Sequence, residues 1–306
     1  MNLYFAPLEG ITTYIYRKTH HEIFGGCNEY YAPFIVPSDD ERITKKSLKD
    51  ILPENNNNYK LRVQVLANKS ESFFKFEKVI KDIGYNEVNI NLGCPSGTVV
   101  SKGRGAGFLR DTDALDNFLY SVFEGTSLKV SVKTRVGFYN SDEFEEILSI
   151  YNKYPIAELI VHPRVREQYY KGNPDVKCFD FTYKGCLNPI CYNGDVCSKD
   201  VFLNIKDKYP SLSGVMIGRG AVVNPAIFRE INGGEKLAID EIIEFTEKLS
   251  FNYMEVLKSE TFTLHKLKEV WFYMIENFSD DKKIVKSIKK SQKLAEFLNC
   301  VKEIQK

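Results

Sequence analysis

The sequence predicts an α/β fold, a (β/α)8 TIM barrel followed by a small all-α C-terminal domain. Short apolar runs recur roughly every 30 residues up to residue 220, and amphipathic stretches such as 71–84 and 142–154 lie between them. From Asp240 onward the pattern is helical to the end. Strands that alternate with helices pair in parallel through right-handed crossovers, and eight such strands close a barrel.

The predicted strands are rich in Val, Ile, Leu or Tyr and end at Gly, Pro or a polar residue. They are 3–7, 29–36, 61–67, 87–93, 129–135, 158–164, 189–195 and 214–220. A doubly wound open sheet is the rival architecture, and it favours a glycine-rich turn after the first strand. Here the first strand leads instead into Ala6-Pro7-Leu8-Glu9-Gly10.

Polar side chains stand at the C-terminal end of almost every predicted strand. They are Gln64, Asn91, Cys94, Lys133, His162, Asn193, Asp195 and Arg219. In a barrel these ends converge on one mouth, where the chemistry takes place, whereas an open sheet does not bring all eight together. We therefore expect a single active site there.

The chain divides near Asn232-Gly233-Gly234, where the strand–helix alternation stops. We predict a barrel domain over 1–234 and a helical domain over 235–306. Asp240 is the expected N-cap of the first helix of the second domain. One face of that helix is apolar, with Ile242, Phe245, Leu249, Tyr253 and Val256.

The charge is balanced overall but not along the chain. Lys and Arg total 42 against 41 Asp and Glu, a net charge of +1, which argues against coating of nucleic acid over the whole surface. Residues 258–306 contain 11 Lys and 7 acids, so their net charge is +4 and the rest of the chain sums to −3. We predict that one helix face contacts backbone phosphates, the alternative being a merely solvated face; its lysines are Lys282, Lys286, Lys289 and Lys293.

The sequence points to a reducing compartment. It shows no signal-peptide pattern and no apolar run of membrane-spanning length. Seven cysteines, an odd number without a CxxC pair, predict free thiols and a cytoplasmic protein. Four cysteines within 178–197 leave a metal site open, but their spacing matches no zinc pattern, so we predict no metal.

Two glycine turns predict a phosphate site. Gly218-Arg219-Gly220 leads from the eighth strand into a helix, and Asn193-Gly194-Asp195 follows the seventh strand. Backbone amides at these positions suit the phosphate of a nucleotide-like cofactor. Lys133 can stabilise the negative charge of a reduced isoalloxazine ring, and Gln64 can donate to its pyrimidine edge.

Cys94 heads a glycine-rich stretch, 93–107, which implies a mobile lid or a close approach to the ligand. A free thiol has a pKa of about 8.5 and is therefore mostly protonated at neutral pH. We predict that Cys94 is a general acid. The alternative is a small buried cysteine in a tight turn.

In these stretches the chain resembles the dihydrouridine synthase family of flavoenzymes. The resemblance covers residues 1–306, and its most specific part is NLGCPSGTVVSKGRGAGFL at 91–109. Further matches, in the right order, lie at 6–10, 63–67, 130–137, 161–172, 193–195 and 214–228. The chain departs from the family at Thr12-Thr13, where a Thr-Asp pair is common, and at Pro33-Phe34, where a Glu often precedes an aromatic residue or Met.

The resemblance implies an FMN-bearing barrel, a helical domain that grips tRNA, and reduction of a uridine C5=C6 bond with NADPH or NADH. It implies that reduced flavin delivers hydride to C6 and that Cys94 protonates C5 of a uridine that has left its stack. Asn91 and Arg164 match the family's positions near the target base. The positions that match flavin contacts are Pro7, Leu8, Glu9, Gly10, Gln64, Lys133, His162, Asn193, Gly194, Asp195, Gly218 and Arg219.

Three alternatives stay open at this point. The same reaction on ribosomal RNA is one. A flavin barrel that reduces a free pyrimidine is another, although it has less need of a basic helical tail. A non-catalytic RNA-binding protein is the third, and it predicts loss of Cys94 or Lys133, both of which are present. We expect a monomer without a stable protein partner.

Overall fold

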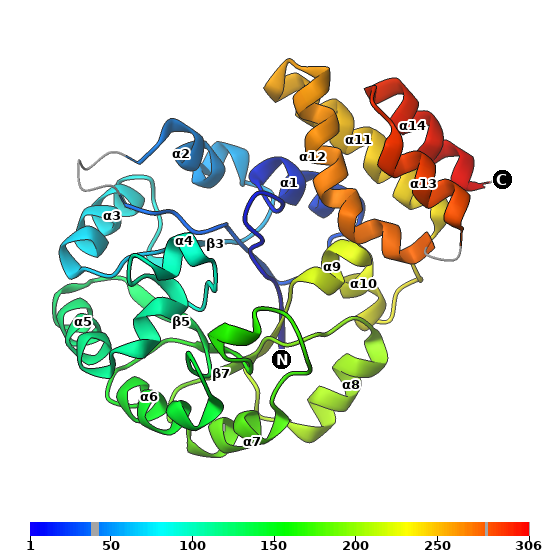
Figure 1. Cartoon of the computed structure of the whole chain (residues 1–306). Coiled ribbons are helices and arrows are strands. Elements are labelled where there is room, and N and C mark those ends of the chain that lie inside the picture. Colours follow the sequence, from blue (N-terminus) through cyan, green and yellow to red (C-terminus); the bar gives the residue numbers. More distant parts are fainter. Residues whose placement is uncertain (38–42, 279–280, 306) are drawn as a thin grey trace.

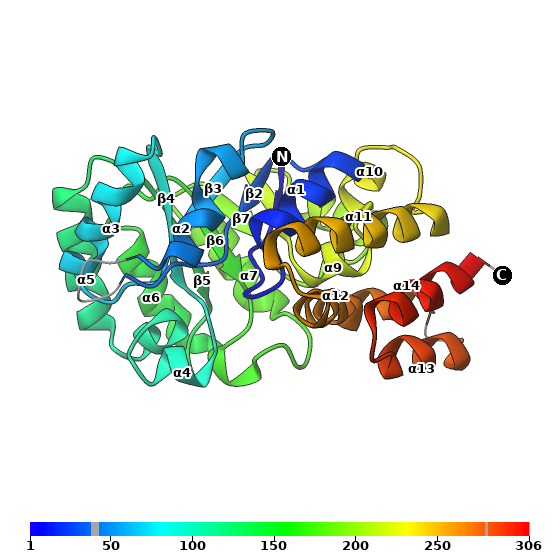
Figure 2. The same ribbon diagram turned by 90° about the horizontal axis from the view of Figure 1, so that it is seen from above.

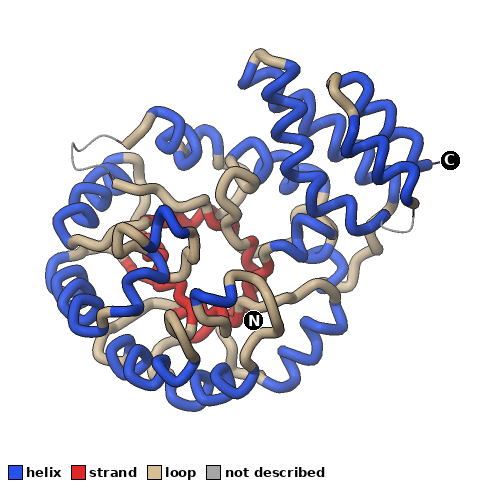
Figure 3. The backbone as a smooth tube through the Cα atoms, viewed as in Figure 1, coloured by secondary structure: helices blue, strands red, loops and turns tan. Residues whose placement is uncertain are grey.

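The computed structural model describes residues 1–37, 43–278 and 281–305, and its centre is a closed barrel of eight parallel strands in the order β1 to β8 (Figures 1 and 3). Because β1 pairs with both β2 and β8, the barrel has no open edge. This confirms the predicted TIM barrel. The strands are β1 (Asn2–Phe5), β2 (Glu29–Tyr31), β3 (Leu61–Val65), β4 (Glu87–Leu92), β5 (Lys129–Arg135), β6 (Leu159–His162), β7 (Ile190–Tyr192) and β8 (Gly214–Ile217).

All eight predicted strands are present, and most are shorter than their apolar runs. The largest difference is at β2, which ends at Tyr31 although the run continues to residue 36. Pro33 has no backbone N–H to donate, and after it only Ile35 makes an isolated bridge to Val65. The chain beyond β2 is therefore a loop at the mouth of the barrel.

Helices surround the strands (Figure 3), and the predicted helices 71–84 and 142–154 correspond to α3 and α6. Residues from several strands, including Tyr4, Tyr31 and Met216, fill the barrel interior. The helices of this layer are α1 (Tyr14–Ile23), α2 (Lys45–Ile51), α3 (Ser70–Asp82), α4 (Gly97–Val100), α5 (Thr112–Gly125), α6 (Phe144–Tyr151), α7 (Val176–Gly185), α8 (Lys199–Lys208), α9 (Arg219–Val223) and α10 (Ile227–Ile231).

The last four helices form a group beside the barrel, next to α1 and α9 (Figures 1 and 2). The apolar face of the first of them packs inward as predicted, except that Val256 is exposed. This helix also begins earlier than predicted, so Asp240 lies in its first turn, and the Ala238 N–H donates to the Glu241 carboxylate at 2.9 Å. The four are α11 (Ile239–Leu257), α12 (Glu260–Met274), α13 (Lys282–Lys290) and α14 (Leu294–Lys302).

The prediction that four lysines share one helix face is wrong for the last of them, Lys293. α13 ends at Lys290, and Lys293 stands at the start of α14. The end of α13 is stabilised by the Lys268 ammonium, which donates to the backbone carbonyls of Lys289 and Ser291 at 3.1 and 2.5 Å. The three remaining lysines of the predicted face lie exposed on α13. No helix among the described residues is long and apolar enough to cross a membrane.

Candidate active site

A pocket of about 590 Å³ opens at the C-terminal mouth of the barrel. This is within the size range of small-molecule and cofactor sites. It gathers thirteen of the residues that the sequence places at the site. These are Pro7, Leu8, Glu9, Gln64, Asn91, Cys94, Lys133, His162, Asn193, Gly194, Asp195, Gly218 and Arg219.

Besides the four lysines of the C-terminal helices, two predicted site residues do not line the pocket. The carbonyl of Gly10 accepts a hydrogen bond from the Lys266 ammonium at 3.1 Å, on the side of the loop that meets α12. Arg164 is only 1% exposed and lies behind the pocket wall, where its guanidinium pairs with the Asp195 carboxylate and donates to the Gly172 carbonyl at 2.6 Å. These bonds engage both Nη atoms of Arg164, whereas its buried Nε has no hydrogen-bond partner among the described residues. A contact between Arg164 and a substrate base stays a prediction.

The predicted phosphate-contacting lysines stand apart from the pocket. Lys282, Lys286 and Lys289 lie on α13, and Lys293 at the start of α14; both helices are on the outer side of the helical group (Figure 1). They can contact only a substrate that extends well beyond the barrel mouth.

A chain of side-chain amides runs across the wall from β5 to the Cys94 loop. Asn89 donates to the Ser131 hydroxyl at 2.9 Å, Gln64 donates to the Asn89 carbonyl at 2.8 Å, and Asn91 donates to the Gln64 carbonyl at 2.8 Å. The Asn91 carbonyl in turn accepts from the Cys94 N–H at 2.9 Å. These bonds leave one N–H of Gln64 for a ligand, consistent with its predicted donor role.

Cys94 is held from several sides. Its carbonyl accepts from the Ala106 N–H at 3.0 Å, and Gly105 packs so closely that a Cβ there would stand 2.8 Å from the Cys94 carbonyl oxygen. Residues Gly105–Arg110 form a 3-10 helix that supports this contact. Gly105 thus allows a close approach to the backbone of Cys94. The mobile lid, and the close approach of this stretch to a ligand, stay predictions.

Burial keeps the Cys94 thiol protonated. Burial raises the pKa of Cys94 above its usual value, and the positive charges of Arg135 and Lys133 reduce that rise. Burial lowers the pKa of Lys133 to about 8, and the charge of Arg135 contributes to this shift. The Lys133 ammonium makes no hydrogen bond or ion pair within the described part of the chain. The pocket therefore offers one proton donor and one largely unpaired cation.

His162 is neutral and of one tautomer. Burial, followed by the charges of Arg135 and Lys133, lowers its pKa well below the usual value. Its Nε2 lies 3.0 Å from Nη1 of Arg164, which can only donate, so Nε2 accepts and Nδ1 carries the proton. The Nδ1–H has no partner among the residues that the structure describes, and it is free to donate to a bound group.

Asp195 connects the loops after β6, β7 and β8. Although burial alone raises the pKa of Asp195, its bonds with Arg164 and the charge of Arg219 bring the pKa below its usual value. The Arg219 guanidinium donates to the Asp195 carboxylate at 2.7 Å. Gly220, at the start of α9, lies so close to the loop after β7 that a Cβ on Gly220 would stand 2.1 Å from the carbonyl oxygen of Val196. The two predicted glycine turns are thus pressed together.

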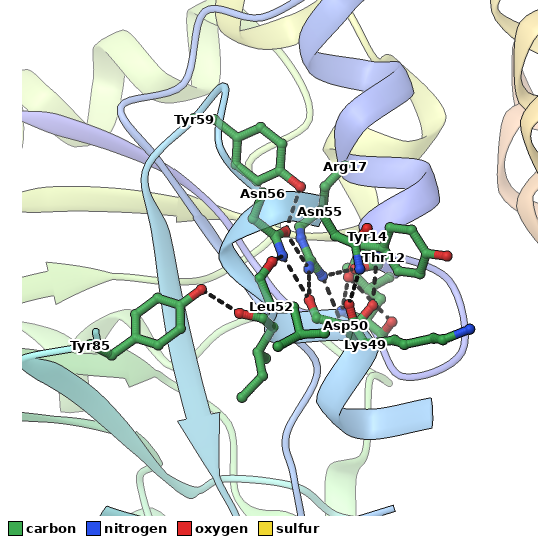
Figure 4. Close-up of polar contacts among 12 residues, drawn as sticks. Thr12, Tyr14, Arg17, Lys49, Asp50, Leu52, Asn55, Asn56, Tyr59 and Tyr85 are labelled. Atoms are coloured by element: carbon green, nitrogen blue, oxygen red, sulfur yellow. Dashed lines mark hydrogen bonds and ion pairs between the residues drawn. The ribbon is translucent and has the colours of Figure 1, made fainter. Parts of the chain in front are cut away.

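The loop between β1 and α1, which carries residues 7–9 into the pocket, is anchored by a buried arginine (Figure 4). The Leu8 N–H donates to the Thr12 hydroxyl at 2.8 Å. Arg17 donates to the Thr12 carbonyl at 2.6 Å and to the carboxylate and backbone carbonyl of Asp50 at 3.2 and 2.6 Å. This network ties the pocket loop to α1 and α2.

The sequence reasoning missed five residues around the pocket. Tyr170 lines it, with its ring centre 4.6 Å from the guanidinium carbon of Arg219. Arg135 follows Lys133 by two positions, and side chains two apart on a strand point to the same side, so this signal was available. Phe272, Tyr273 and Glu276 come from α12 and the turn after it, and no local pattern marks them.

Within the part of the chain that is described, no group of three or more His, Cys, Asp or Glu could hold a metal ion. Similarity to solved structures agrees with the barrel. Morphinone reductase superposes with a TM-score of 0.54 at 10% identity, over 78% of this chain and 87% of its own. A variant of NCR from Zymomonas mobilis gives a TM-score of 0.55 at 14% identity, over 78% and 90%. At these identities the likeness shows the fold alone.

Sequence comparison is more specific. A protein from Staphylococcus epidermidis named as a probable tRNA-dihydrouridine synthase is 27% identical over 239 residues, which cover 74% of this chain and 70% of the relative. Probable tRNA-dihydrouridine synthase 2 of Bacillus subtilis is 28% identical over 233 residues, with the same coverage. The family model for dihydrouridine synthases matches residues 4–306. With nearly its whole length matched, the chain belongs to the dihydrouridine synthase family.

Proposed function

We propose that this protein is a tRNA-dihydrouridine synthase that reduces the C5=C6 bond of uridines in tRNA, with FMN as cofactor and NADPH or NADH as reductant. Membership of the family and the names of the relatives support the reaction and the substrate. The observation that carries the proposal is a protonated thiol, Cys94, in the same pocket as the unpaired Lys133 ammonium. A two-electron reduction of a double bond needs these two functions, a proton for one carbon and stabilisation of negative charge nearby.

The residues present fit a flavin. Lys133 offers a cation without an acceptor, His162 offers an Nδ1–H, and Gln64 offers one N–H, so three donors converge on one pocket. A reduced isoalloxazine ring is anionic, and a cation next to it lowers the energy of that state. Gly218 and Arg219 stand at the start of α9, where they suit the cofactor phosphate.

A reduced flavin held by Lys133, His162 and Gln64 would supply the hydride for C6 of the uracil ring. The Cys94 thiol gives its proton to C5, so that hydride and proton together complete the reduction, and the thiolate regains a proton from water. The raised pKa of Cys94 keeps this proton in place at neutral pH. The Asn91 side chain positions the Cys94 backbone through its carbonyl.

The test is reduction of unmodified tRNA transcripts by the purified protein, with dihydrouridine measured by mass spectrometry. The wild-type protein should be yellow with bound flavin and should form dihydrouridine. Cys94→Ala should retain flavin and should still oxidise NADPH with an artificial electron acceptor, but it should form product at least about 100-fold more slowly. Undiminished product formation by Cys94→Ala would show that the proton comes from elsewhere.

The same assay separates the alternatives. Ribosomal RNA transcripts and free uracil are offered at matched uridine concentration. Reduction of free uracil as fast as of tRNA would contradict a polymer substrate, and a preference for ribosomal RNA would move the substrate from tRNA to rRNA. A protein that binds no flavin would refute the proposed enzyme altogether.

A further inference from the structure

We propose that Arg135 is a positioning residue that joins the Cys94 loop to the loop after β6 and thereby sets the thiol for proton transfer. The inference rests on the proposed function, because it assigns a role in the protonation step. Arg135 does not act on substrate in this scheme. It acts through the backbone on either side of the pocket.

The guanidinium of Arg135 makes three hydrogen bonds, all to backbone carbonyls. Nε donates to Gly93 at 2.9 Å, Nη1 to Val165 at 3.0 Å and Nη2 to Tyr169 at 2.7 Å. Gly93 immediately precedes Cys94, whereas Val165 and Tyr169 belong to the loop after β6. One side chain on β5 therefore connects two loops that are separated by about 70 residues in the sequence.

This cation is buried without a carboxylate partner. Arg135 is 1% exposed, and no acidic side chain of the described residues lies within 4 Å of it. The centre of the Tyr170 ring lies 5.4 Å from the guanidinium carbon, and both residues line the pocket. Burial lowers the pKa of Arg135 to about 10. Burial of an unpaired charge destabilises the folded state. The hydrogen bonds from Arg135 to the two loops offset this cost.

The Cys94 side of the connection is tightly packed. A Cβ at Gly93 would stand 3.3 Å from the carbonyl carbon of Thr134, so the loop lies directly against β5. The Cys94 N–H and C=O are bound to Asn91 and Ala106. With the Gly93 carbonyl held by Arg135, the peptide groups on both sides of the Cys94 Cα are fixed. The position of Cβ follows from them, so Sγ is confined to the few staggered positions around the Cα–Cβ bond.

The other side ends at a strained residue. Tyr169 adopts φ 51°, a left-handed conformation that costs a tyrosine free energy. Its carbonyl is the one that accepts from Nη2 of Arg135. Tyr170, which follows, contacts Arg135 and Arg219 at the pocket mouth. Arg135 thus stabilises the turn that brings Tyr170 to the same pocket as Cys94, and loss of the guanidinium should loosen both loops together.

The test uses Arg135→Lys, which keeps the charge but has a single nitrogen that cannot reach three carbonyls. Arg135→Gln, which is neutral and less costly to bury, is the second variant. Arg110→Lys is the matched control, because Arg110 also donates to two carbonyls, those of Gly107 and Val100, but in a single segment. The flavin-loaded protein is used throughout.

The first measurement is hydrogen exchange. In both Arg135 variants, amides of 93–98 and of 165–172 should exchange about tenfold faster or more, whereas Arg110→Lys should leave 165–172 unchanged. Unchanged exchange in either loop of both Arg135 variants would overturn the proposal. This result does not depend on substrate, so it decides whether Arg135 joins the loops even if the protein reduces no RNA and the proposed function is wrong.

The second measurement is turnover. For Arg135→Lys we expect kcat on tRNA to fall about tenfold or more with KM within about threefold, because a misplaced thiol slows protonation without removing binding. The solvent deuterium isotope effect on kcat should rise, while NADPH oxidation with an artificial acceptor stays within about twofold. If amide exchange became faster but kcat and the isotope effect stayed unchanged, Arg135 would have a structural role only. That result would overturn its role in positioning the thiol.

Discussion

Gly220 is the position at which a single methyl group should separate two loops of the pocket. In Gly220→Ala the new Cβ would stand 2.1 Å from the carbonyl oxygen of Val196 and 3.2 Å from the Cα of Cys197. A relaxed carbon–oxygen contact is about 3.3 Å, so the loop after β7 and the start of α9 must move apart by about 1 Å. Both partners are backbone, and no rotamer change relieves the contact.

Overpacking of this kind costs about 3 kcal/mol at the upper end of its usual range. For a domain of this size that lowers Tm by roughly 6 °C. Because Val196, Cys197 and Arg219 all line the pocket, the same movement should reduce the flavin bound per protein. Thermal unfolding by circular dichroism and the flavin-to-protein absorbance ratio measure the two effects.

Gly185→Ala is the control for Gly220→Ala. Gly185 ends α7, and a Cβ there meets only the Leu148 side chain, at 3.5 Å. We expect this variant to be as stable as the wild type or more stable by up to about 1 kcal/mol, because alanine restricts the unfolded chain. If Gly220→Ala unfolds within about 1 °C of the wild type and binds full flavin, the close approach of the two loops is not a requirement of the pocket.

Three further predictions concern pH, substrate contact and charge. Burial lowers the pKa of His20 to about 3, so below pH 6.5 only the unfolded chain binds a proton at this histidine, and the folded state loses stability. Between pH 7 and 5 the free energy of unfolding should fall by about 1.9 kcal/mol for this reason. If the free energy of unfolding of His20→Gln fell as steeply with pH as that of the wild type, His20 would not be the cause. Phe272, 69% exposed at the pocket rim, should contribute base stacking, so Phe272→Ala should raise KM for tRNA about tenfold, whereas Phe251→Ala, equally exposed on α11 away from the pocket, should not. Charge reversal at Lys286 and Lys289 should weaken tRNA binding about tenfold at low salt with flavin content unchanged, and intact affinity would make this a solvated face.

The barrel was predictable because its signal is local. Each strand is a short apolar run, and the eight runs need no tertiary information to be counted. The end of α13 is different, because lysines continue through Lys290 and Lys293 with helical spacing. The chain turns extended at Ser291, and Lys268 on α12 binds the carbonyls of Lys289 and Ser291 at this end of the helix. Sequence spacing contains no trace of that contact.

Site residues were predictable to the extent that barrel geometry brings strand ends together. Lys133 and His162 reach the pocket for that reason. The roles of the two arginines near them were not predictable. Arg164 is drawn away from the pocket by the Asp195 carboxylate, while Arg135 is turned toward the carbonyls of two loops. Which arginine meets which partner depends on loops that only the folded chain brings into contact.

The distribution of charge around the mouth bears on the choice between a polymer and a free pyrimidine. α12 brings Phe272 and Tyr273 to the pocket wall, and the 3-10 turn that follows it brings Glu276, so this end of the helical group presents aromatic rings and a carboxylate. A carboxylate at the mouth repels phosphate, and the exposed lysines of α13 lie farther out on the helical group (Figure 1). A free pyrimidine has no use for the outer lysines. An RNA chain uses both regions, with one unstacked base at the rim and its backbone phosphates on α13, and this separation supports a polymer substrate.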